Sequence, residues 1–578
     1  MKKNVLALSI TAAVVGLSFA GGAQAMTGTL QGAPANSSLS FNPDGVGHML
    51  LVPYYSAQAE NSTLINLVNT DTINGKAVKV RFRGAANSDD VFDFQVFLSP
   101  GDVFAFNVSK NSAGLAQFTT TDNSCTKPAK AVLNSTPFLT ARLDNTLGAA
   151  DRANGTREGY VEIFNMADIP RASFAAGGAG PDVPAAGSVA GDGVNDLFTV
   201  IKHVNKVAPC TGSAWTALDT TNLAYSDVNA GSRGAGLLPP TTGLMANTII
   251  INVVGAAAWS ASATAIQSVT PAVGLNINEV PSTGNVVYWP QTSSAVGTAA
   301  GSGVNEYTAD PLLRTSNVFN AAGAADVTPA VTAAFYDLPD MSTPYSGTAN
   351  AAVLGVRPLR QAADLTQAIA TTSVTNEFLT DSTISAATDW TFSMPTRRYN
   401  VSLDYAAINT TPGLLDDGRR FSDIFATATT DGNGTGIQAY FNAANTLVTS
   451  RQICVRNVVP TAWDREETTI GSTGVVVSPS TPADPLTFCG EASVLSFNRG
   501  GISAAGTGAL KAQVSVKDLD ASFADGWMRI TTPSATAITG AVVAGNVSGL
   551  PILGSSYNRA SAGGVQTFGA SHAHRFGR

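Results

Sequence analysis

Alternating apolar and polar positions dominate the early part of the chain. Residues 63–69 form a β run that ends in the turn-forming residues 69–71, and residues 78–83 alternate strictly between apolar and charged side chains. Residues 91–97 and 103–106 predict two further strands on either side of a tight turn at 98–102. Short strands separated by turn signals predict an antiparallel β-sandwich. The alternation argues against a parallel sheet, whose strands are apolar on both faces.

The same pattern returns along the rest of the chain, with a weak stretch between about 265 and 375. Further strands are predicted at 160–164, 248–254, 389–394, 399–403, 452–459, 493–497, 513–516 and 527–530, and short helices near 196–206, 311–322 and 359–371. The predicted fold is mainly β, with two or more antiparallel β-sandwich (Ig-like) regions, long Gly/Ala/Ser/Thr-rich loops and a few short helices. Residues 175–193 are one such loop.

The chain is too long for one compact core, so several regions are expected. We predict a signal peptide at 1–25, an N-terminal β-sandwich region at 26–265, a loop-rich connecting region with short helices at 266–375, and a C-terminal β-rich region at 376–578.

The first 25 residues have the layout of a secretory signal peptide. Lys2 and Lys3 precede an uncharged apolar run over 5–20, and Ala23-Gln24-Ala25 supplies the small residues that a signal peptidase requires. Cleavage is expected after Ala25. No cysteine follows that point directly, so a lipid anchor is not expected. No later apolar run is long enough for an integral membrane span of the mature chain.

Four cysteines, Cys125, Cys210, Cys454 and Cys489, are expected to meet an oxidising compartment after export. Two disulfides are therefore predicted. Three pairings are open. We favour Cys125–Cys210 and Cys454–Cys489 because each pair stays within one half of the chain. A metal site is disfavoured because no CxxC spacing or neighbouring histidine is present.

Charged residues are only 13% of the chain, and the formal net charge is −8. An acidic chain without a basic block is a poor candidate for binding nucleic acid. A neutral polar surface suits sandwiches that associate side by side, so self-association or contact with envelope components is expected.

Catalytic motifs are lacking: we find no G-x-S-x-G elbow, HExxH motif or P-loop. The chain has four histidines, His48, His203, His572 and His574. We interpret His48 as structural. His572 and His574 have a spacing at which two strand residues can share a metal, but we favour an exposed pair in a tail.

Asp431, Asn433 and Thr435 resemble the start of a calcium loop, with oxygen donors at alternate positions before Gly436. Position twelve is Asn442, where an EF-hand requires glutamate. We favour a polar turn and keep calcium as an alternative hypothesis; no other cofactor is expected.

Aromatic and acidic clusters also have two interpretations. The aromatic residues could form a surface on which sugar rings stack, or they could lie in the core, as aromatics in sandwiches usually do. We favour the core. The aromatics concerned are Tyr54, Tyr55, Trp259, Tyr288, Trp289, Trp390, Trp463 and Trp527. For residues 464–467 (DREE), we favour a salt-bridged corner over an acid–base pair, because consecutive residues point to different sides.

Several phrases of the chain resemble a family of large exported proteins of Gram-negative bacteria, described as cell-surface or S-layer-like proteins. They are VKVRFRGAANSDDVFDFQVFLSPGDVF (78–104), YDLPDMSTPY (336–345), NEFLTDSTISAATDWTFSMPTRR (376–398), WDREE (463–467), ADGWMRI (524–530), GLPILG (549–554) and HAHRFGR (572–578). The phrases spread over most of the mature chain. The resemblance implies a surface location and a structural role, and it brings no catalytic motif.

The expected function is a non-catalytic structural protein of the bacterial cell surface, with a self-assembling, S-layer-like role. A secreted adhesin or carbohydrate-binding protein is the alternative. A secreted hydrolase is less well supported, because histidines are few and no nucleophile motif is present.

Overall fold

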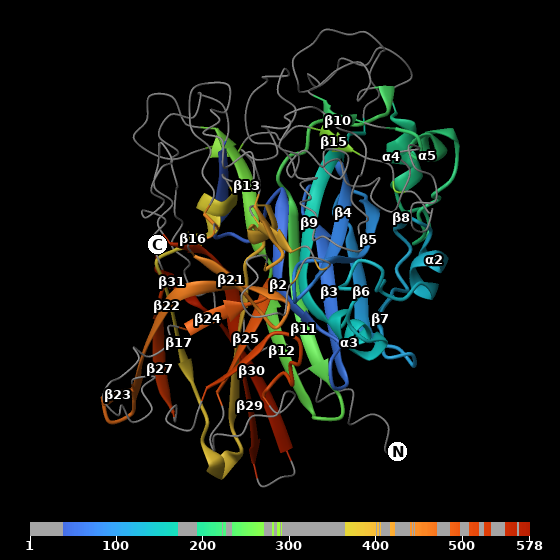
Figure 1. Ribbon diagram of the computed structural model, residues 1–578. Coiled ribbons are helices and arrows are strands. Elements are labelled where there is room, and N and C mark those ends of the chain that lie inside the picture. Colours follow the sequence, from blue (N-terminus) through green and yellow to red (C-terminus); the bar gives the residue numbers. More distant parts are fainter. Residues whose placement is uncertain are drawn as a thin grey trace, which may run out of the picture.

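Two β-sandwiches, one from each half of the chain, account for most of the regular structure (Figure 1). Their strands pair antiparallel, except for the parallel pair of β25 (Ala492–Phe497) and β26 (Val516–Leu519). The structure is a computed structural model. It describes residues 38–577 except 172–193, 222, 227–233, 271–279, 282–285, 289–290, 292–364, 400, 404, 406–407, 409–416, 422–439, 442, 444, 471–485, 498–507, 520–524, 533–548 and 563–565. The prediction of a mainly β, sandwich-rich fold is confirmed.

The N-terminal sandwich has an eight-stranded and a five-stranded sheet. The first runs β1 (Ser38–Asn42), β13 (Thr264–Thr270), β2 (Met49–Ser56), β9 (Glu158–Ile169), β4 (Gly75–Gly84), β5 (Asp90–Leu98), β8 (Cys125–Lys127), with β14 (Val280–Pro281) beside β13. The second runs β12 (Ala257–Ser262), β11 (Leu244–Asn252), β3 (Asn61–Asn69), β6 (Val103–Lys110), β7 (Ala116–Thr119). β13 continues the larger sheet beyond residue 265, the predicted end of the N-terminal region.

Strand periodicity explains the core between these two sheets. Val78, Val80 and Phe82 of β4 point into it together, because alternate residues of a strand share a face. Phe92 and Phe138 stack there with ring centroids 4.8 Å apart. The remaining phenylalanines of this core also contact one another, and burying such rings contributes strongly to sandwich stability.

The C-terminal sandwich also has two sheets. The seven-stranded sheet runs β21 (Thr446–Thr449), β22 (Gln452–Asp464), β27 (Gly526–Thr531), β17 (Ser373–Phe378), β31 (Arg575–Gly577), with β23 (Thr469–Ile470) and β24 (Leu486–Cys489) paired to β22. The five-stranded sheet runs β26 (Val516–Leu519), β25 (Ala492–Phe497), β18 (Ala387–Ser393), β29 (Leu553–Ala562), β30 (Gln566–Ala573). Trp390, Phe392, Phe497 and Met528 lie in the core between them.

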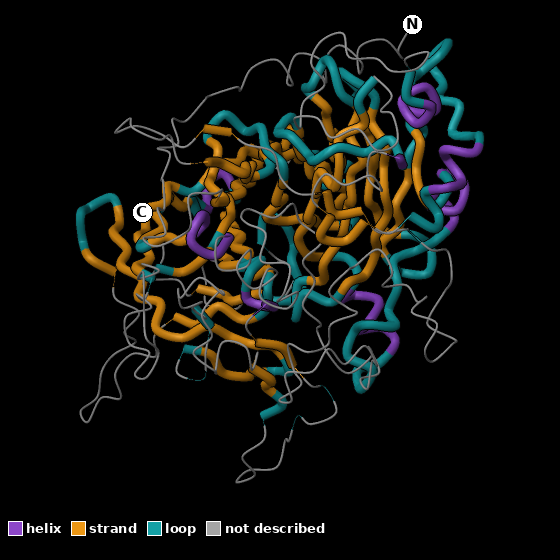
Figure 2. Tube along the Cα trace, turned by 90° about the horizontal axis from the view of Figure 1, so that it is seen from above, coloured by secondary structure: helices purple, strands orange, loops and turns teal. Residues whose placement is uncertain are grey.

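Short elements cover the ends of the sheets. The helices are α2 (Lys130–Ser135), α3 (Ala149–Gly155), α4 (Asp196–Ile201) and α5 (Ser213–Ala217), with 3-10 turns η4 (Ser382–Ile384) and η5 (Arg397–Tyr399). Three two-stranded pairs complete the described strands: β10 (Leu223–Ser226) with β15 (Val286–Tyr288), β16 (Ala370–Thr371) with β28 (Leu550–Pro551), and β19 (Val401–Leu403) with β20 (Arg419–Phe421). Figure 2 shows several helical segments along one margin of the molecule and others between the groups of strands.

Most predicted strands lie where the sequence pattern placed them, with three differences. The strand expected at 248–254 ends at Asn252, because Val253 and Val254 belong to the turn that leads to β12. The strand expected at 399–403 begins at Val401, because Arg397–Tyr399 forms a 3-10 turn. The strand expected at 513–516 begins at Val516, because the preceding segment is bonded to side chains instead of a neighbouring strand. α4 confirms a short helix within the range expected near 196–206, although it ends at Ile201. Residues 365–369 of the helix expected at 359–371 are helical. The helix expected at 311–322 and the loop at 175–193 lie outside the described residues.

Both disulfides of the favoured pairing are present. Cys125 at the start of β8 is bonded to Cys210, which follows α4. Cys454 of β22 and Cys489 of β24 are direct cross-strand partners. Each bond therefore closes a loop within one sandwich, and neither joins the two halves.

The two sandwiches share buried apolar clusters. One combines Met49, Leu51 and Phe164 with Ile369 and Leu553. A second also draws on both halves: Tyr54, Ala85, Ile250, Ala257, Trp259, Ala492, Val494, Leu510, Ala512 and Tyr557. The edge strands β12 and β30 lie side by side, with Ser571 Oγ donating to the carbonyl of Ser260. Each thus shields the other's exposed edge.

Gly490 marks a close approach of the two backbones. The amides of Glu491 and Ala492 both donate to the carbonyl of Ala85, at 2.8 and 3.1 Å. Gly490 has φ +82°, and a Cβ there would lie 2.6 Å from that same oxygen. A side chain at this position would force the sandwiches apart.

Gly490→Ala should therefore destabilise the protein more than a glycine substitution that meets only backbone strain. Gly101 is the matched control, because it has φ +71° and a Cβ added there would have no atom within 4 Å. We expect both variants to lose about 1–2 kcal/mol from the left-handed backbone, and Gly490→Ala to lose about 1–3 kcal/mol more from overpacking. Chemical denaturation measures both losses. Equal losses would contradict the close approach.

Candidate functional site

The second face of β4 carries charged side chains that are fully enclosed. Lys79, Arg81 and Arg83 alternate with the core residues of this strand and are at most 1% exposed. Arg398 of the C-terminal sandwich lies at the Arg81–Arg83 end of this face, where it pairs with Glu162, and Gln291 bonds to Lys79 at the other end. Together with Glu162, Arg397, Arg398 and Glu491, these side chains form a group of buried charges where the two sandwiches meet, and we refer to it as the charged seam.

Glu162 of β9 connects the two sides of the charged seam. Its carboxylate lies 3.2 Å from Arg83 Nε and 3.7 Å from Arg81 Nη1, both from β4. Its other oxygen accepts from Arg398 Nη2 at 2.6 Å, across the seam. Arg397 beside it pairs with Glu491. A carboxylate between cations of both halves fixes how the sandwiches dock, because an unpaired buried charge is costly.

Further polar contacts extend the charged seam. Tyr405 Oη donates to Asp89 at 2.6 Å, and Arg451 pairs with Asp144 while donating to the carbonyl of Tyr405 at 2.9 Å. Burial lowers the pKa of Lys79, although its partner Asp93 acts in the opposite direction. These groups bind one another, which suits docking better than contact with a substrate.

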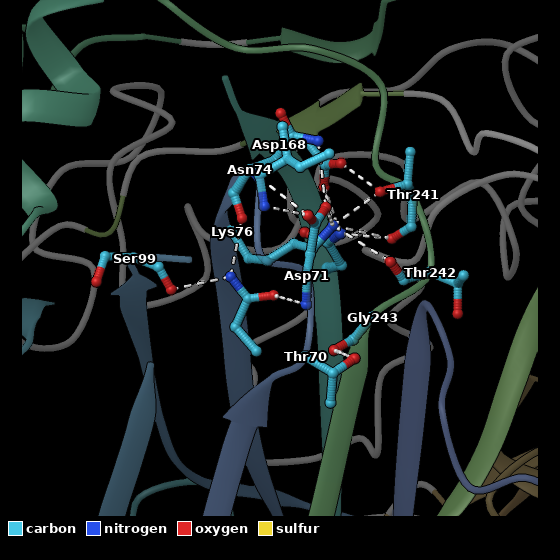
Figure 3. Close-up of polar contacts among 12 residues, drawn as sticks. Thr70, Asp71, Asn74, Lys76, Ser99, Asp168, Thr241, Thr242 and Gly243 are labelled. Carbon is cyan, nitrogen blue, oxygen red and sulfur yellow. Dashed lines mark hydrogen bonds and ion pairs between the residues drawn. The ribbon is translucent and has the colours of Figure 1, made fainter. Parts of the chain in front are cut away.

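A second cluster surrounds the ammonium group of Lys76 (Figure 3). Its Nζ donates to Asp168 Oδ1 at 2.8 Å, to Thr241 Oγ1 at 2.8 Å, and to Asp71 Oδ2 at 3.2 Å. The carbonyl of Thr242 is 3.3 Å away. Lys76 is fully buried, and burial raises the pKa of Asp168 against the effect of this ammonium.

The Lys76 cluster binds three chain segments together. The turn after β3, the end of β9 and the segment before β11 all supply oxygens to one ammonium, as Figure 3 shows. The oxygens converge on a cation that the chain itself provides. The arrangement therefore holds the end of the sandwich in shape, and it does not present a nucleophile to solvent.

Lys76→Met should be strongly destabilising, because it leaves the buried Asp168 without its cation. We expect a loss of about 3–5 kcal/mol in the free energy of unfolding. The matched control is Lys110→Met: Lys110 pairs with Glu60 on the surface, and such pairs contribute about 0–1 kcal/mol. Urea titration of both variants distinguishes them. A loss no larger for Lys76→Met than for Lys110→Met would contradict this role.

A strap formed by residues 508–515 is held by one carboxylate from each half. Glu158 accepts from the amide of Gln513 at 2.7 Å, and Asp389 accepts from the amide of Leu510 at 2.7 Å. Burial raises the pKa of Glu158 to about 7 and that of Asp389 to about 6, and the strap amides oppose both shifts. These carboxylates are buried in the seam, where they face backbone amides.

Glu158→Gln should remove the free-energy cost of ionising a buried carboxylate, a cost that grows with pH. The folded pKa of about 7 exceeds the ordinary value of 4.5, so the folded state binds more protons between these values. Stability contributed by Glu158 is thus complete below about pH 4.5 and is lost as the pH rises to about 7. The stability of Glu158→Gln minus that of the wild type should therefore increase by on the order of 3 kcal/mol from pH 4 to 8.

The comparison with the wild type also removes the opposite slope of His574. Burial lowers the pKa of His574 to about 3, so this residue destabilises the fold below its ordinary value of 6.5. Both proteins contain His574, so its effect cancels in the difference. A difference that stays constant with pH would show that Glu158 does not titrate as stated.

The histidine pair at 572 and 574 corrects one prediction. His574 is not in an exposed tail: it stacks on Phe392 with ring centroids 4.9 Å apart, and its Nε2 lies 3.2 Å from the carbonyl of Thr391. His572 is exposed. The strand is interrupted at His574, between the end of β30 and the start of β31, so the two imidazoles do not share one face of a strand. His48 is buried, as expected, and its Nδ1 accepts from the amide of Ser268 at 3.1 Å.

The aromatic residues divide into a buried set and a pair on the surface. Core positions are confirmed for Tyr54, Tyr55, Trp259, Tyr288 and Trp390; Trp289 lies outside the described residues. The core prediction is wrong for Trp527, which is 43% exposed and stacks on the half-buried Trp463 with ring centroids 4.1 Å apart. The two indoles are cross-strand partners of β22 and β27, on the face of the seven-stranded sheet opposite to the core residue Met528. Figure 1 shows these two strands on the side of the C-terminal sandwich remote from β4 and β9.

Residues 464–467 form the expected salt-bridged corner beside this pair. Arg465 pairs with Asp525 and lies 3.8 Å from Asp381. Asp464 accepts from the amides of Glu466 and Thr468 at 3.0 and 2.8 Å. The carboxylate of Asp464 is thus engaged by the turn's own backbone.

No group of three or more His, Cys, Asp or Glu residues in the described part of the chain is arranged to hold a metal ion. The calcium hypothesis is not tested by this, because Asp431, Asn433 and Thr435 lie outside the described residues. Within the described ranges, no helix has the length and apolar character needed to span a membrane.

Comparisons of the chain with family models, curated proteins and solved structures found no match. Its function is therefore inferred from its own residues.

Sequence reasoning missed the charged seam and the surface tryptophan pair. A signal for the first was present: in a chain with few charges, residues 76–93 and the Arg397-Arg398 pair concentrate them. A signal for the second was the Trp-x-Arg run of 527–529, in which an aromatic and a cation share one face of a strand.

Proposed function

We propose that the protein is a non-catalytic structural component of the bacterial cell surface that is exported and self-associates. The observation that supports this most is the charged seam, which joins two sandwiches through Glu162 and Arg398. Such a seam makes a rigid block of large outer surface. It also uses the chain's charged groups for docking, where they are sealed from substrates.

Export is supported by the layout of residues 1–25 and by the two disulfides. Disulfides persist in oxidising compartments and are rare in the cytosol. Self-association is supported by the scarcity of charge, which leaves a neutral polar surface with little long-range repulsion between copies. The resemblance of the phrases between 78 and 578 to surface proteins points the same way.

Electron microscopy of the native envelope, before and after deletion of the gene, tests this function. We expect a regular surface layer that disappears on deletion. The full gene should restore it, whereas a gene encoding residues 26–578 alone should not, because its product stays inside the cell. An unchanged envelope, together with a monomeric protein in solution, would contradict the proposal.

Carbohydrate binding by an adhesin is the second candidate function. It is favoured by one observation, the stacked Trp463–Trp527 pair, since aromatics at a surface are the usual platform for sugar rings. Each of these indoles, however, already uses one face to stack on the other.

A further inference from the structure

The outer face of the seven-stranded sheet has a regular pattern of charge. Its first row, across β22, β27 and β17, is Trp463, Trp527 and Glu377. Its second row, two residues along the strands, is Thr461, Arg529, Thr375 and Arg575, the last from β31. We call these seven residues the tryptophan–arginine face.

The charges of the tryptophan–arginine face lack partners within the described chain. Glu377, Arg529 and Arg575 are all exposed, and no ion pair is formed by any of them with a described residue. Arg529 and Arg575 stand on either side of Thr375 in one row. Because neighbouring strands are about 4.8 Å apart, the two arginines begin roughly 10 Å apart with a gap between them.

We propose that this face binds the same face of a second copy of the chain, related by a two-fold axis. The axis runs between the two copies, parallel to their sheets, perpendicular to the strands and midway between the two rows. It places the first row of each copy over the second row of the other. Glu377 then lies over Thr375 of the second copy, between its Arg529 and Arg575. A two-fold contact repeats this arrangement on both sides.

The same operation places the exposed indole against a cation. Trp527 lies over Arg529 of the second copy, because both belong to β27 and the axis keeps each strand over itself. A guanidinium over an indole is attractive, and more so when water is excluded. Face-to-face sheets are about 10 Å apart, a distance that Glu, Arg and Trp side chains together span.

Charge complementarity favours a second copy over a glycan as the occupant. The face carries Glu377 in its first row, and Arg529 and Arg575 in its second. The two-fold axis exchanges these rows, so each acid meets the bases of the other copy. An anionic glycan would meet Glu377 as well as the arginines. The inference rests on the proposed self-association and assigns one of its contacts.

Charge reversal on the secreted, disulfide-bonded protein tests the proposal. Glu377→Arg makes the face wholly cationic, and Arg529→Glu with Arg575→Glu makes it wholly acidic. We expect the wild type to be a dimer in analytical ultracentrifugation, and each variant alone to dissociate at least about tenfold more readily. Mixing the two variants should restore a dimer, since each then meets its opposite.

Lys517→Glu is the matched control. It changes the charge by the same magnitude as Glu377→Arg, at an exposed position of β26 in the other sheet. It should remain a dimer. Restoration by mixing also shows that both variants are folded.

Three outcomes would overturn the proposal: a wild-type monomer at all soluble concentrations, variants that remain dimers alone, or a mixture that stays monomeric. If a monomeric wild type binds dextran sulfate, and the variant with Arg529→Glu and Arg575→Glu does not, the face would be assigned to glycans instead. If the dimer fails while the surface layer persists in the envelope, this contact is wrong and the proposed function stands.

Discussion

The docking of the two sandwiches depends on one buried carboxylate, Glu162, held between Arg81 and Arg83 of its own half and Arg398 of the other. Desolvating these groups is costly, and the cost is offset only when every partner is in place. The pairing therefore selects one relative position of the sandwiches. The shared apolar clusters around Phe164 and Trp259 supply the attraction between the halves, and the charges determine its geometry.

Local periodicity was sufficient to find the strands, because a residue's face in a strand depends only on its neighbours. This periodicity predicted the strand β4, with Val78, Val80 and Phe82 on one face. It did not reveal that Lys79, Arg81 and Arg83 are covered as well, since an alternating strand usually leaves its polar side to solvent. The residues that cover them, such as Arg398, lie far along the chain. The same limit explains why the strand expected at 513–516 begins only at Val516, since the amide of Gln513 is bonded to the side chain of Glu158.

The candidate site was only partly predictable for the same reason. Favouring core positions for aromatics succeeded for Trp390, where the sandwich closes over the ring, and failed for Trp527, whose face of the sheet stays open. The buried His574 was missed because a break between two strands redirects its side chain. The favoured cysteine pairing, in contrast, followed from chain halves alone, and these coincide with the two sandwiches. The proposed role in assembly connects to this fold through the tryptophan–arginine face, which the docking of the two sandwiches leaves open.

Hydrogen exchange in the Arg398→Met variant tests the unity of the two sandwiches most directly. If the charged seam makes them one cooperative body, the amides of Val80 in β4 and Phe392 in β18 should lose protection by the same free energy, although Arg398 belongs to only one half. Loss of protection confined to Phe392 and the C-terminal sandwich, with Val80 unchanged, would show that the halves are stable independently and that the seam does not unite them.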